Sequence, residues 1–374
     1  MELSIVILNY KVPHYLMLCL DSVSKAIQGL DAEIIVIDNN SEDESLVLTH
    51  QHFPEVKTIA NKENTGFAKA NNQAVKEAQG TYVCILNPDT VVSEHCFRDL
   101  LKVHKIQKNT GAIGTQLIDG NGHYLPESKR NIPHPNVAFQ KLIGIDHSYY
   151  DNSLTPEESG ETSVLVGAFM FLKREDYTAD NGFDEDFFMY GEDIDLSYKL
   201  LKKGLRNYYV GELKTIHFKG ESTLKDKKYY DRFFGAMLIF YQKHYSNKFI
   251  ELSLKSALKF FKLKALKTQK KSPVNTYHEA VIITENNSDF TTLEQSFKNI
   301  IFIKEEDIPL LNKISLEEKY VIFDAKAISY AEIIEKIVNW REIPAKFRIK
   351  PTQLNFCVGS DSKDKQGESL GLDL

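Results

Sequence analysis

Apolar runs alternate with segments of helical spacing from Met1 to Leu86. The runs are short and almost continuously apolar, which is typical of strands that a sheet buries on both faces. They read "SIVILNY", "AEIIVID", "VKTIAN" and "TYVCIL". Between them, apolar residues recur every three or four positions, as they do in amphipathic helices. This order predicts an α/β domain with a mostly parallel central sheet and helices on both faces.

Residue types at the predicted helix starts support this order. Pro13 opens "PHYLMLCLDSVSKAI", and proline is well placed in the first turn of a helix. Ser41 and Glu44 have the S-x-x-E spacing of a capping box, so we expect the second helix to begin there. The third helix, "GFAKANNQAVKEAQG", should end at Gly80.

The alternation continues to residue 245, with longer elements. "SVLVGAFMFLKRE" predicts one long strand, "DLSYKLLKKG" a helix and "NYYVGELKTI" another strand. The aromatic-rich segment "KDKKYYDRFFGAMLIFYQKHYSN" predicts a further helix. We therefore place the first domain at residues 1–245.

A second, smaller α/β unit is predicted over residues 275–360, after a connector at 246–274. Its expected strands are "EAVIIT", "KNIIFI", "KYVIFDA" and "NFCVGS", and its expected helices are "DFTTLEQSF" and "SYAEIIEKIVNW". It contains no glycine-rich phosphate loop, metal cluster or nucleophile elbow, so we expect an accessory or oligomerising domain. Residues 361–374 resemble a mobile tail.

Composition and charge narrow the class of protein. A net charge of −6 spread over 374 residues provides no footprint for nucleic acid. The four cysteines are scattered, which indicates buried thiols in a reducing compartment. No basic stretch precedes the first apolar run, and no run of about 18 apolar residues occurs, so we expect neither a signal peptide nor a membrane span. These features favour a cytoplasmic protein.

Polar residues collect where the first four predicted strands end. Asn9 follows the first strand, Asp38 the second, "NKENTGF" the third and Asn87-Pro88-Asp89 the fourth. Asn, Pro and Asp also favour plain turns, so any one of these ends could be loop chemistry alone. Four such ends at one edge of a parallel sheet, however, are where open α/β sheets bind ligands.

The motifs "SIVILNY", "VIDNNSED", "NTGFAKANN" and "LNPDT", in this order and spacing, resemble family 2 glycosyltransferases. These are inverting nucleotide-sugar enzymes of GT-A fold, and the likeness is greatest to rhamnosyltransferase-like members of bacterial polysaccharide synthesis. The resemblance covers residues 1–245. It implies a nucleoside-diphosphate sugar donor, with UDP-sugars and dTDP-rhamnose both compatible, and a glycan or lipid-linked acceptor.

The resemblance also implies which residues bind the donor. Asp38 corresponds to the aspartate that accepts a hydrogen bond from the base. The other positions implied to line the nucleotide are Leu8, Asn9, Asn64, Gly66, Lys69, Asn71 and Asn87. For Lys69 and Asn71, a solvated helix face is the competing interpretation.

In this rhamnosyltransferase-like subgroup the N-P-D motif stands where other GT-A enzymes carry D-x-D, which implies that Asp89 binds the metal. A divalent cation stabilises the charge on a leaving diphosphate, and Mn²⁺ or Mg²⁺ needs only one or two carboxylates beside phosphate and water. Asn87 is neutral, so a second carboxylate ligand is lost. His217, in "TIHFKGEST", is a second candidate ligand by resemblance, although a lone histidine on a strand is often simply packed.

The segment "FDEDFFMYGEDIDLSYKLLKKGL" places six acidic residues within twelve positions. So many like charges are unfavourable unless some are paired, exposed or functional. Glu192 and Asp193 stand where a helix begins, and acidic side chains are favoured there for structural reasons alone. The pair also resembles the E-D motif of inverting enzymes, which implies Asp193 as the general base and Glu192 as a group that positions the acceptor.

The connector changes the charge balance locally. Residues 248–272 contain eight lysines and one acidic residue, Glu251, with apolar residues mostly on one helical face. A solvated connector helix would account for this pattern. A basic amphipathic helix on an anionic membrane surface would also do so, and would place the protein peripherally on the inner face of the cytoplasmic membrane.

Two other functions share parts of this pattern. A sugar-nucleotide nucleotidyltransferase can use the same sheet, but its glycine-rich loop after the first strand is missing from "LNYKVP". A non-catalytic nucleotide-binding scaffold would not need Asp89 or the Glu192-Asp193 pair. We therefore expect an inverting, metal-dependent glycosyltransferase.

Overall fold

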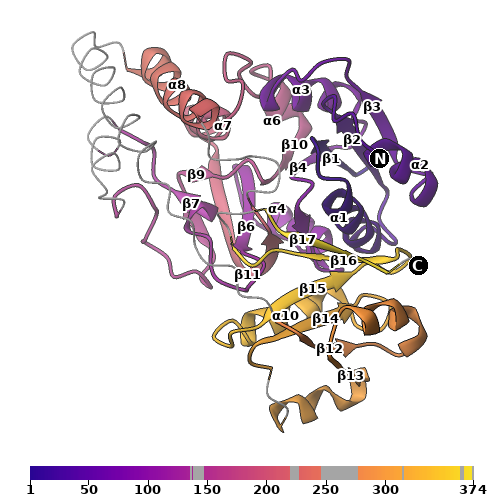
Figure 1. Cartoon of the computed structure of the whole chain (residues 1–374). Coiled ribbons are helices and arrows are strands. Elements are labelled where there is room, and N and C mark those ends of the chain that lie inside the picture. The colour runs from indigo at the N-terminus through magenta and orange to yellow at the C-terminus, as the bar shows by residue number, and fades with distance from the viewer. Residues whose placement is uncertain are drawn as a thin grey trace.

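Two large β-sheets, each covered by helices, organise the described part of the chain, and a third sheet consists of two short strands (Figure 1). The computed structural model describes residues 1–134, 137, 147–219, 227–245, 277–313, 316–362 and 366–372. The basic connector at 248–272 lies outside these residues. Within the described ranges, no helix combines the length and the apolar character needed to cross a membrane.

The larger sheet contains the four predicted strands that end in polar residues. Within the described residues it has nine strands in the order β3-β2-β1-β4-β10-β6-β11-β5, with β8 beside β11. Their bounds are β1 Leu3–Asn9, β2 Ala32–Asp38, β3 Lys57–Ala60, β4 Tyr82–Leu86, β5 Thr90–Val91, β6 Thr110–Ile118, β8 Gly160–Thr162, β10 Phe169–Lys173 and β11 Arg206–His217. Strands β1 to β4 are parallel, whereas β10 runs antiparallel to both of its neighbours. The predicted fold class is confirmed.

Helices cover both faces of this sheet because successive strand residues alternate between two cores. The helices are α1 Pro13–Ala26, α2 Ser45–His52, α3 Phe67–Glu77, α4 Cys96–Ile106, α6 Arg174–Thr178, α7 Glu192–Lys202 and α8 Lys227–His244. On one face α1 and α4 pack against Ile5 and Ile7 of β1. On the other, α3, α6 and α7 pack against Val6 and Leu8. The predicted alternation of strands and helices over residues 1–86 is thereby confirmed.

Two local predictions are wrong. No capping box forms at Ser41, because its hydroxyl donates to Asp38 instead, and α2 begins later, at Ser45. The long strand predicted over residues 163–175 is two strands, β9 Val164–Leu165 and β10. The chain turns between them at Gly167, whose backbone N–H donates to Asp193. Strand β9 pairs with β7 Lys129–Arg130, which follows the short helix η1 Pro126–Ser128.

The second sheet forms the C-terminal unit, drawn in orange and yellow in Figure 1. Its order is β13-β12-β14-β15-β16-β17. The elements are β12 Glu279–Ile283, η2 Asn287–Gln295, β13 Asn299–Ile303, η3 Glu305–Lys313, β14 Lys319–Asp324, α10 Tyr330–Asn339, β15 Lys346–Lys350, β16 Phe356–Gly359 and β17 Glu368–Gly371. The four predicted strands are present, and β15 was missed. Strand β17, within the predicted tail, pairs with β16 and extends the unit beyond residue 360.

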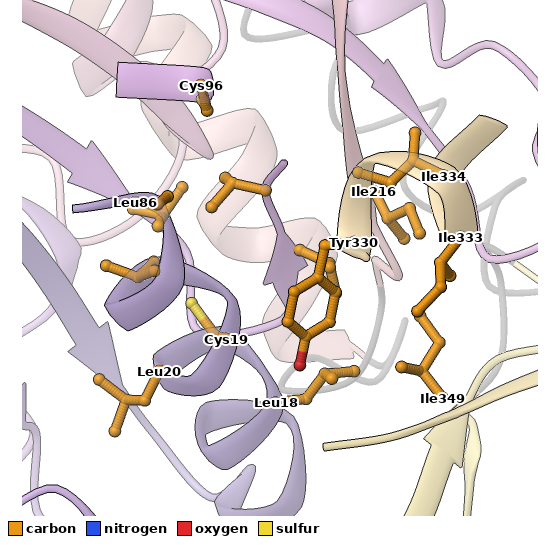
Figure 2. Close-up of a cluster of buried hydrophobic side chains, with 14 of the residues drawn as sticks. Leu18, Cys19, Leu20, Leu86, Cys96, Ile216, Tyr330, Ile333, Ile334 and Ile349 are labelled. Carbon is orange, nitrogen blue, oxygen red and sulfur yellow. The ribbon is translucent and has the colours of Figure 1, made fainter. Parts of the chain in front are cut away.

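One hydrophobic core joins the two sheets. Buried residues of α1 and β11 and buried residues of α10 and β15 belong to the same cluster. Figure 2 shows Tyr330, Ile333 and Ile334 beside Leu18 of α1 and Ile216 of β11. The C-terminal unit is therefore packed against the first domain and does not hang from it by a linker alone.

Candidate active site

The ends of β1 and β2 meet through their polar side chains. Asn9 pairs in register with Asp38, and its amide donates to Asp38 Oδ1 at 2.7 Å. Ser41 adds a hydroxyl donor to Oδ1 at 2.5 Å and a backbone donor to Oδ2 at 2.9 Å. The Asp38 carboxylate is thus held in one orientation, and Oδ2 keeps more acceptor capacity than Oδ1.

Asn39 orders the loop that follows β3. Its side-chain oxygen accepts from Asn61 and from the backbone and hydroxyl of Thr65. Its amide donates to Asn64 Oδ1 at 3.0 Å and to the backbone oxygen of Gly66 at 3.3 Å. One asparagine therefore sets the shape of the segment that leads into α3. Sequence reasoning left it out of the predicted site, although it directly follows Asp38.

Gly66 begins α3 at a point with no room for a side chain. Its φ of 87° is left-handed, and a Cβ there would lie 2.5 Å from the backbone oxygen of Phe188. Further along α3, Lys69 is exposed, whereas Asn71 is fully buried and donates to the backbone oxygen of Phe67. Of these two predicted nucleotide contacts, only Lys69 presents a side chain at the surface.

Asp89 and His217 lie side by side at the ends of β4 and β11. The Nε2 atom of His217 is 3.4 Å from Asp89 Oδ1 and 3.4 Å from the amide nitrogen of Asn87. Strand β5 places them there, because Thr90 pairs with His217 and the Phe218 N–H donates to the backbone oxygen of Asp89. The sequence suggested both residues, and the structure brings them together.

This pair fits a divalent cation that is also held by substrate phosphate. In the described part of the chain, no three His, Cys, Asp or Glu side chains form a metal cage. One carboxylate and one imidazole are sufficient where phosphate and water supply the remaining ligands. An imidazole beside a carboxylate suits Mn²⁺ better than the harder Mg²⁺.

Most carboxylates of the acidic segment 183–195 have a hydrogen-bond or ion-pair partner from another part of the fold, and one does not. Lys243 pairs with Asp184 and Asp186, and Asn72 donates to Glu185. Asp195 lies 2.6 Å from His244 Nε2 and 2.7 Å from Lys199 Nζ. These four carboxylates tie α7 and the preceding loop to α3 and α8, so their role is structural.

Asp193 is held by three donors at the start of α7. The Arg130 guanidinium is 2.6 Å from Oδ2, and the Gly167 N–H is 3.0 Å from the same oxygen. The backbone N–H of Ile194 donates to Oδ1 at 2.8 Å. Burial alone would lower the pKa of Arg130. The neighbouring Asp193 and Tyr149 have the larger, opposite effect, so the pKa of Arg130 is raised above its ordinary value. Sequence reasoning missed Arg130, since nothing near "ESKRN" marks its partner 63 positions away.

Glu192 is the exception in the acidic segment. Its side chain is only 5% exposed, and Oε2 has no hydrogen-bond partner among the described residues. Burial, followed by the neighbouring Asp193 carboxylate, raises the pKa of Glu192 well above its ordinary value. A buried carboxyl oxygen without a partner is unfavourable for stability, and Glu192 is therefore a functional candidate.

A short segment connects the metal-site candidates to this carboxylate pair. The Asn87 N–H donates to the backbone oxygen of Ala168 at 3.0 Å, and the adjacent Gly167 N–H contacts Asp193. A Cβ at Gly167 would lie 3.3 Å from the Asp193 Cβ and 3.5 Å from the Phe67 ring. The ends of β4, α3 and α7 therefore meet at one place on the sheet edge.

Comparison with known proteins identifies the family and several relatives of this chain. Residues 4–178 match the family described as glycosyl transferase family 2. The rhamnosyltransferase WbbL of Escherichia coli K12 is 30% identical over 220 residues, which are 53% of this chain and 79% of that protein. The N-acetylglucosaminyl-diphospho-decaprenol L-rhamnosyltransferase of Mycobacterium tuberculosis is 26% identical over 242 residues, covering 60% of this chain and 78% of that protein.

Among solved structures, a mannosyltransferase of Pyrobaculum calidifontis in complex with GDP-Man and Mn²⁺ has a TM-score of 0.47 and 16% identity, covering 71% of this chain and 72% of that one. The WbbL match spans most of that enzyme, so the resemblance read from the motifs is confirmed. The chain belongs to glycosyl transferase family 2, whose activity is glycosyl transfer.

Proposed function

We propose that this chain is a metal-dependent, inverting glycosyltransferase that moves a sugar from a nucleoside-diphosphate donor to a hydroxyl group of a glycan or lipid-linked acceptor. One observation carries the proposal. Residues 167 and 168 contact Asp193 on one side and the N-P-D motif on the other. The residues that we assign to the incoming hydroxyl and to the leaving diphosphate would therefore act at one sheet edge.

Asp89 and His217 would hold the metal. A cation bound there stabilises the negative charge that develops on the leaving diphosphate. The ends of β1 and β2 would make the remaining contacts to the donor. There Asp38 Oδ2 can accept a hydrogen bond from the N–H of a pyrimidine base. Both UDP and dTDP carry such a group. Two of the relatives are named as rhamnosyltransferases, so we include dTDP-rhamnose beside UDP-sugars among the proposed donors.

Asp193 would take the proton of the acceptor hydroxyl. Inversion requires a carboxylate on the face opposite the leaving group, and general bases must be oriented before the reaction. Arg130 and Gly167 fix Asp193 through Oδ2, while Oδ1 has a single backbone donor and can accept one more proton. Glu192, with its raised pKa, would bind the acceptor as a protonated carboxyl group.

The acceptor is the less defined substrate. The relative from Mycobacterium tuberculosis is named for a lipid diphosphate acceptor, N-acetylglucosaminyl-diphospho-decaprenol. A comparable lipid-linked acceptor would bring this chain to a membrane surface. The eight lysines of residues 248–272 provide a sequence-based reason to expect peripheral contact there.

Screening of nucleotide sugars tests the proposal. Thermal unfolding is measured with UDP- and dTDP-sugars, with and without Mn²⁺, because a ligand of the folded state raises the apparent stability. A donor that stabilises only with Mn²⁺ is then incubated with a glycan acceptor, and the anomeric configuration of the product is read by NMR. Inverted product supports the proposal. Retained configuration, or stabilisation by no nucleotide sugar, contradicts it.

A further inference from the structure

We propose that the C-terminal unit positions the metal-binding end of β11, and that Tyr15 and Phe218 are the positioning residues that connect the two. The inference rests on the proposed metal site at Asp89 and His217. It assigns the unit, predicted from sequence only as an accessory domain, a direct structural part in the first domain's chemistry.

The connection begins at β16. The Tyr15 hydroxyl donates to the backbone oxygen of Gly359 at 3.0 Å, which joins α1 to the C-terminal sheet. The edge of the Tyr15 ring meets the Phe218 ring, with centroids 5.1 Å apart. Both side chains are buried, so solvent does not relieve a displacement of either one.

Phe218 continues the connection to the metal-site candidates. It directly follows His217 in the chain, and its backbone N–H donates to the backbone oxygen of Asp89 at 3.0 Å. A shift of Phe218 therefore moves the backbone that carries both candidate ligands. Helix α1 also reaches the N-P-D motif directly, since Cys19 Sγ is 3.6 Å from the Asn87 backbone oxygen and from Thr90 Oγ1.

Two glycines show how closely the parts are packed. A Cβ at Gly367, just before β17, would lie 2.0 Å from the Tyr15 hydroxyl and 2.4 Å from the Gly359 oxygen. A Cβ at Gly120 would lie 2.6 Å from the Ser360 oxygen and 3.0 Å from the Phe218 ring. The distances to the Tyr15 hydroxyl and to the two backbone oxygens are shorter than real Cβ contacts, so a side chain at either position must displace its neighbours.

The remainder of the interface keeps the C-terminal unit in place. Asp21 of α1 accepts from the Tyr330 hydroxyl, and from the backbone N–H and the hydroxyl of Thr352 at 3.1 and 2.9 Å. Glu94 accepts from the backbone N–H groups of Tyr330 and Ala331 at the start of α10. Figure 2 shows Tyr330 within the shared apolar cluster, beside Leu18 of α1. The unit is thus a fixed support, and small changes at Tyr15 are not absorbed by movement of the whole unit.

The test compares two alanine substitutions at opposite ends of β17, one just before the strand and one at its last residue. Gly367→Ala places a methyl group against Tyr15, whereas a Cβ at Gly371 would meet nothing within 4 Å, so Gly371→Ala is the matched control. Mn²⁺ binding is measured by EPR in the presence of UDP and, separately, of dTDP. Amide exchange of residues 215–219 and thermal unfolding without metal are recorded alongside.

We expect Gly367→Ala to weaken Mn²⁺ binding by about 10-fold, the low end of the range for groups that orient metal ligands, because it acts on the ligands only through Tyr15 and Phe218. It should also speed exchange at Phe218. Gly371→Ala should match the wild type in both. Equal Mn²⁺ affinity in all three proteins would overturn the inference. A wild-type protein that binds no Mn²⁺, or an Asp89→Asn variant that binds it normally, would instead overturn the metal site, and the inference with it.

A milder pair of variants keeps the test decisive if Gly367→Ala fails to fold. Tyr15→Phe removes only the hydroxyl that bonds Gly359, and Tyr330→Phe removes the equivalent hydroxyl that bonds Asp21. Both weaken the same interface. Weaker Mn²⁺ binding in Tyr15→Phe alone supports the inference, whereas equal Mn²⁺ binding in the two variants contradicts it.

Discussion

Arg130 and Asp193 form a buried ion pair, with 2.6 Å between the guanidinium nitrogen and the carboxylate oxygen. Arg130 also donates to the backbone oxygen of Leu165 at 2.9 Å, so it joins β7 to β9 and to the start of α7. An arginine outside every recognised motif therefore holds the residue that we propose as general base. The expected effects of substituting Arg130 or Asp193 depend on this ion pair.

The ion pair should show strong coupling in a double-mutant cycle. Arg130→Met leaves the Asp193 carboxylate buried beside an apolar group, and loss of one partner of a buried pair costs about 3–5 kcal/mol of folding free energy. Adding Asp193→Asn removes the unpaired charge, so the double variant should be more stable than the sum of the single effects. Urea unfolding of the four proteins measures the coupling, and strictly additive effects would show that the pair is not formed.

Glu192 should make stability depend on pH in a defined direction. Its ordinary pKa is 4.5, and the folded protein keeps the proton to higher pH. Between the two pKa values the unfolded state is ionised and the folded state is protonated, so rising pH lowers the wild-type free energy of unfolding by up to about 1.4 kcal/mol per pH unit. Glu192→Gln does not titrate, so its stability relative to wild type should rise from pH 4.5 and level off above the folded-state pKa.

Urea unfolding at a series of pH values between 4 and 8 tests this expectation. Glu212→Gln is the matched control, because Glu212 is exposed on β11. A stability difference between Glu192→Gln and wild type that stays constant with pH would mean that Glu192 is not a buried carboxyl with a raised pKa.

Asp193→Asn should separate chemistry from donor binding. A general base acts only in the chemical step, so kcat should fall by about 10²–10⁴-fold while donor affinity changes little. Steady-state kinetics and calorimetry with the nucleoside diphosphate and Mn²⁺ measure the two quantities. If Asp193→Asn stays active and Glu192→Gln does not, the base is Glu192. If both stay active, the carboxylate pair is structural.

The basic connector should bind anionic membranes. Its lysines would each add about 1 kcal/mol of attraction near such a surface, and salt would weaken that attraction. The protein should therefore co-sediment with anionic vesicles and dissociate at high salt. Replacing Lys255, Lys259, Lys262 and Lys264 by glutamine should abolish most of the binding. Equal binding to neutral vesicles, or none to either kind, would favour a solvated connector.

The first domain could be predicted from sequence because its strands are buried on both faces and appear as continuous apolar runs. Strand β15 could not, because "KFRIK" alternates cations with apolar residues. Arg348 is fully buried there, paired with Asp361 and Glu368 from later segments. A pairing partner that lies distant in sequence leaves no local signal, and the prediction failed for that reason.

In the candidate site too, some residues could be predicted from the sequence and others depend on contacts between distant segments. Asp89 and His217 come from recognisable positions on predicted strands, and the structure places them 3.4 Å apart. The turn at Gly167 and the Arg130 contact depend on chain segments that meet only in the folded protein. Ser41 illustrates a competing effect, because its hydroxyl can cap a helix or hold Asp38, and only the fold decides between these partners.

The central claim is that Asp89 acts on the leaving diphosphate while Asp193 acts on the incoming hydroxyl. Calorimetry of UDP and dTDP binding, with and without Mn²⁺, tests it most directly in wild type, Asp89→Asn and Asp193→Asn, with thermal unfolding as the check on folding. We predict Mn²⁺-dependent binding of one nucleotide to wild type and to Asp193→Asn, and loss of that binding in a folded Asp89→Asn. Unchanged Mn²⁺-dependent binding in Asp89→Asn would contradict the account.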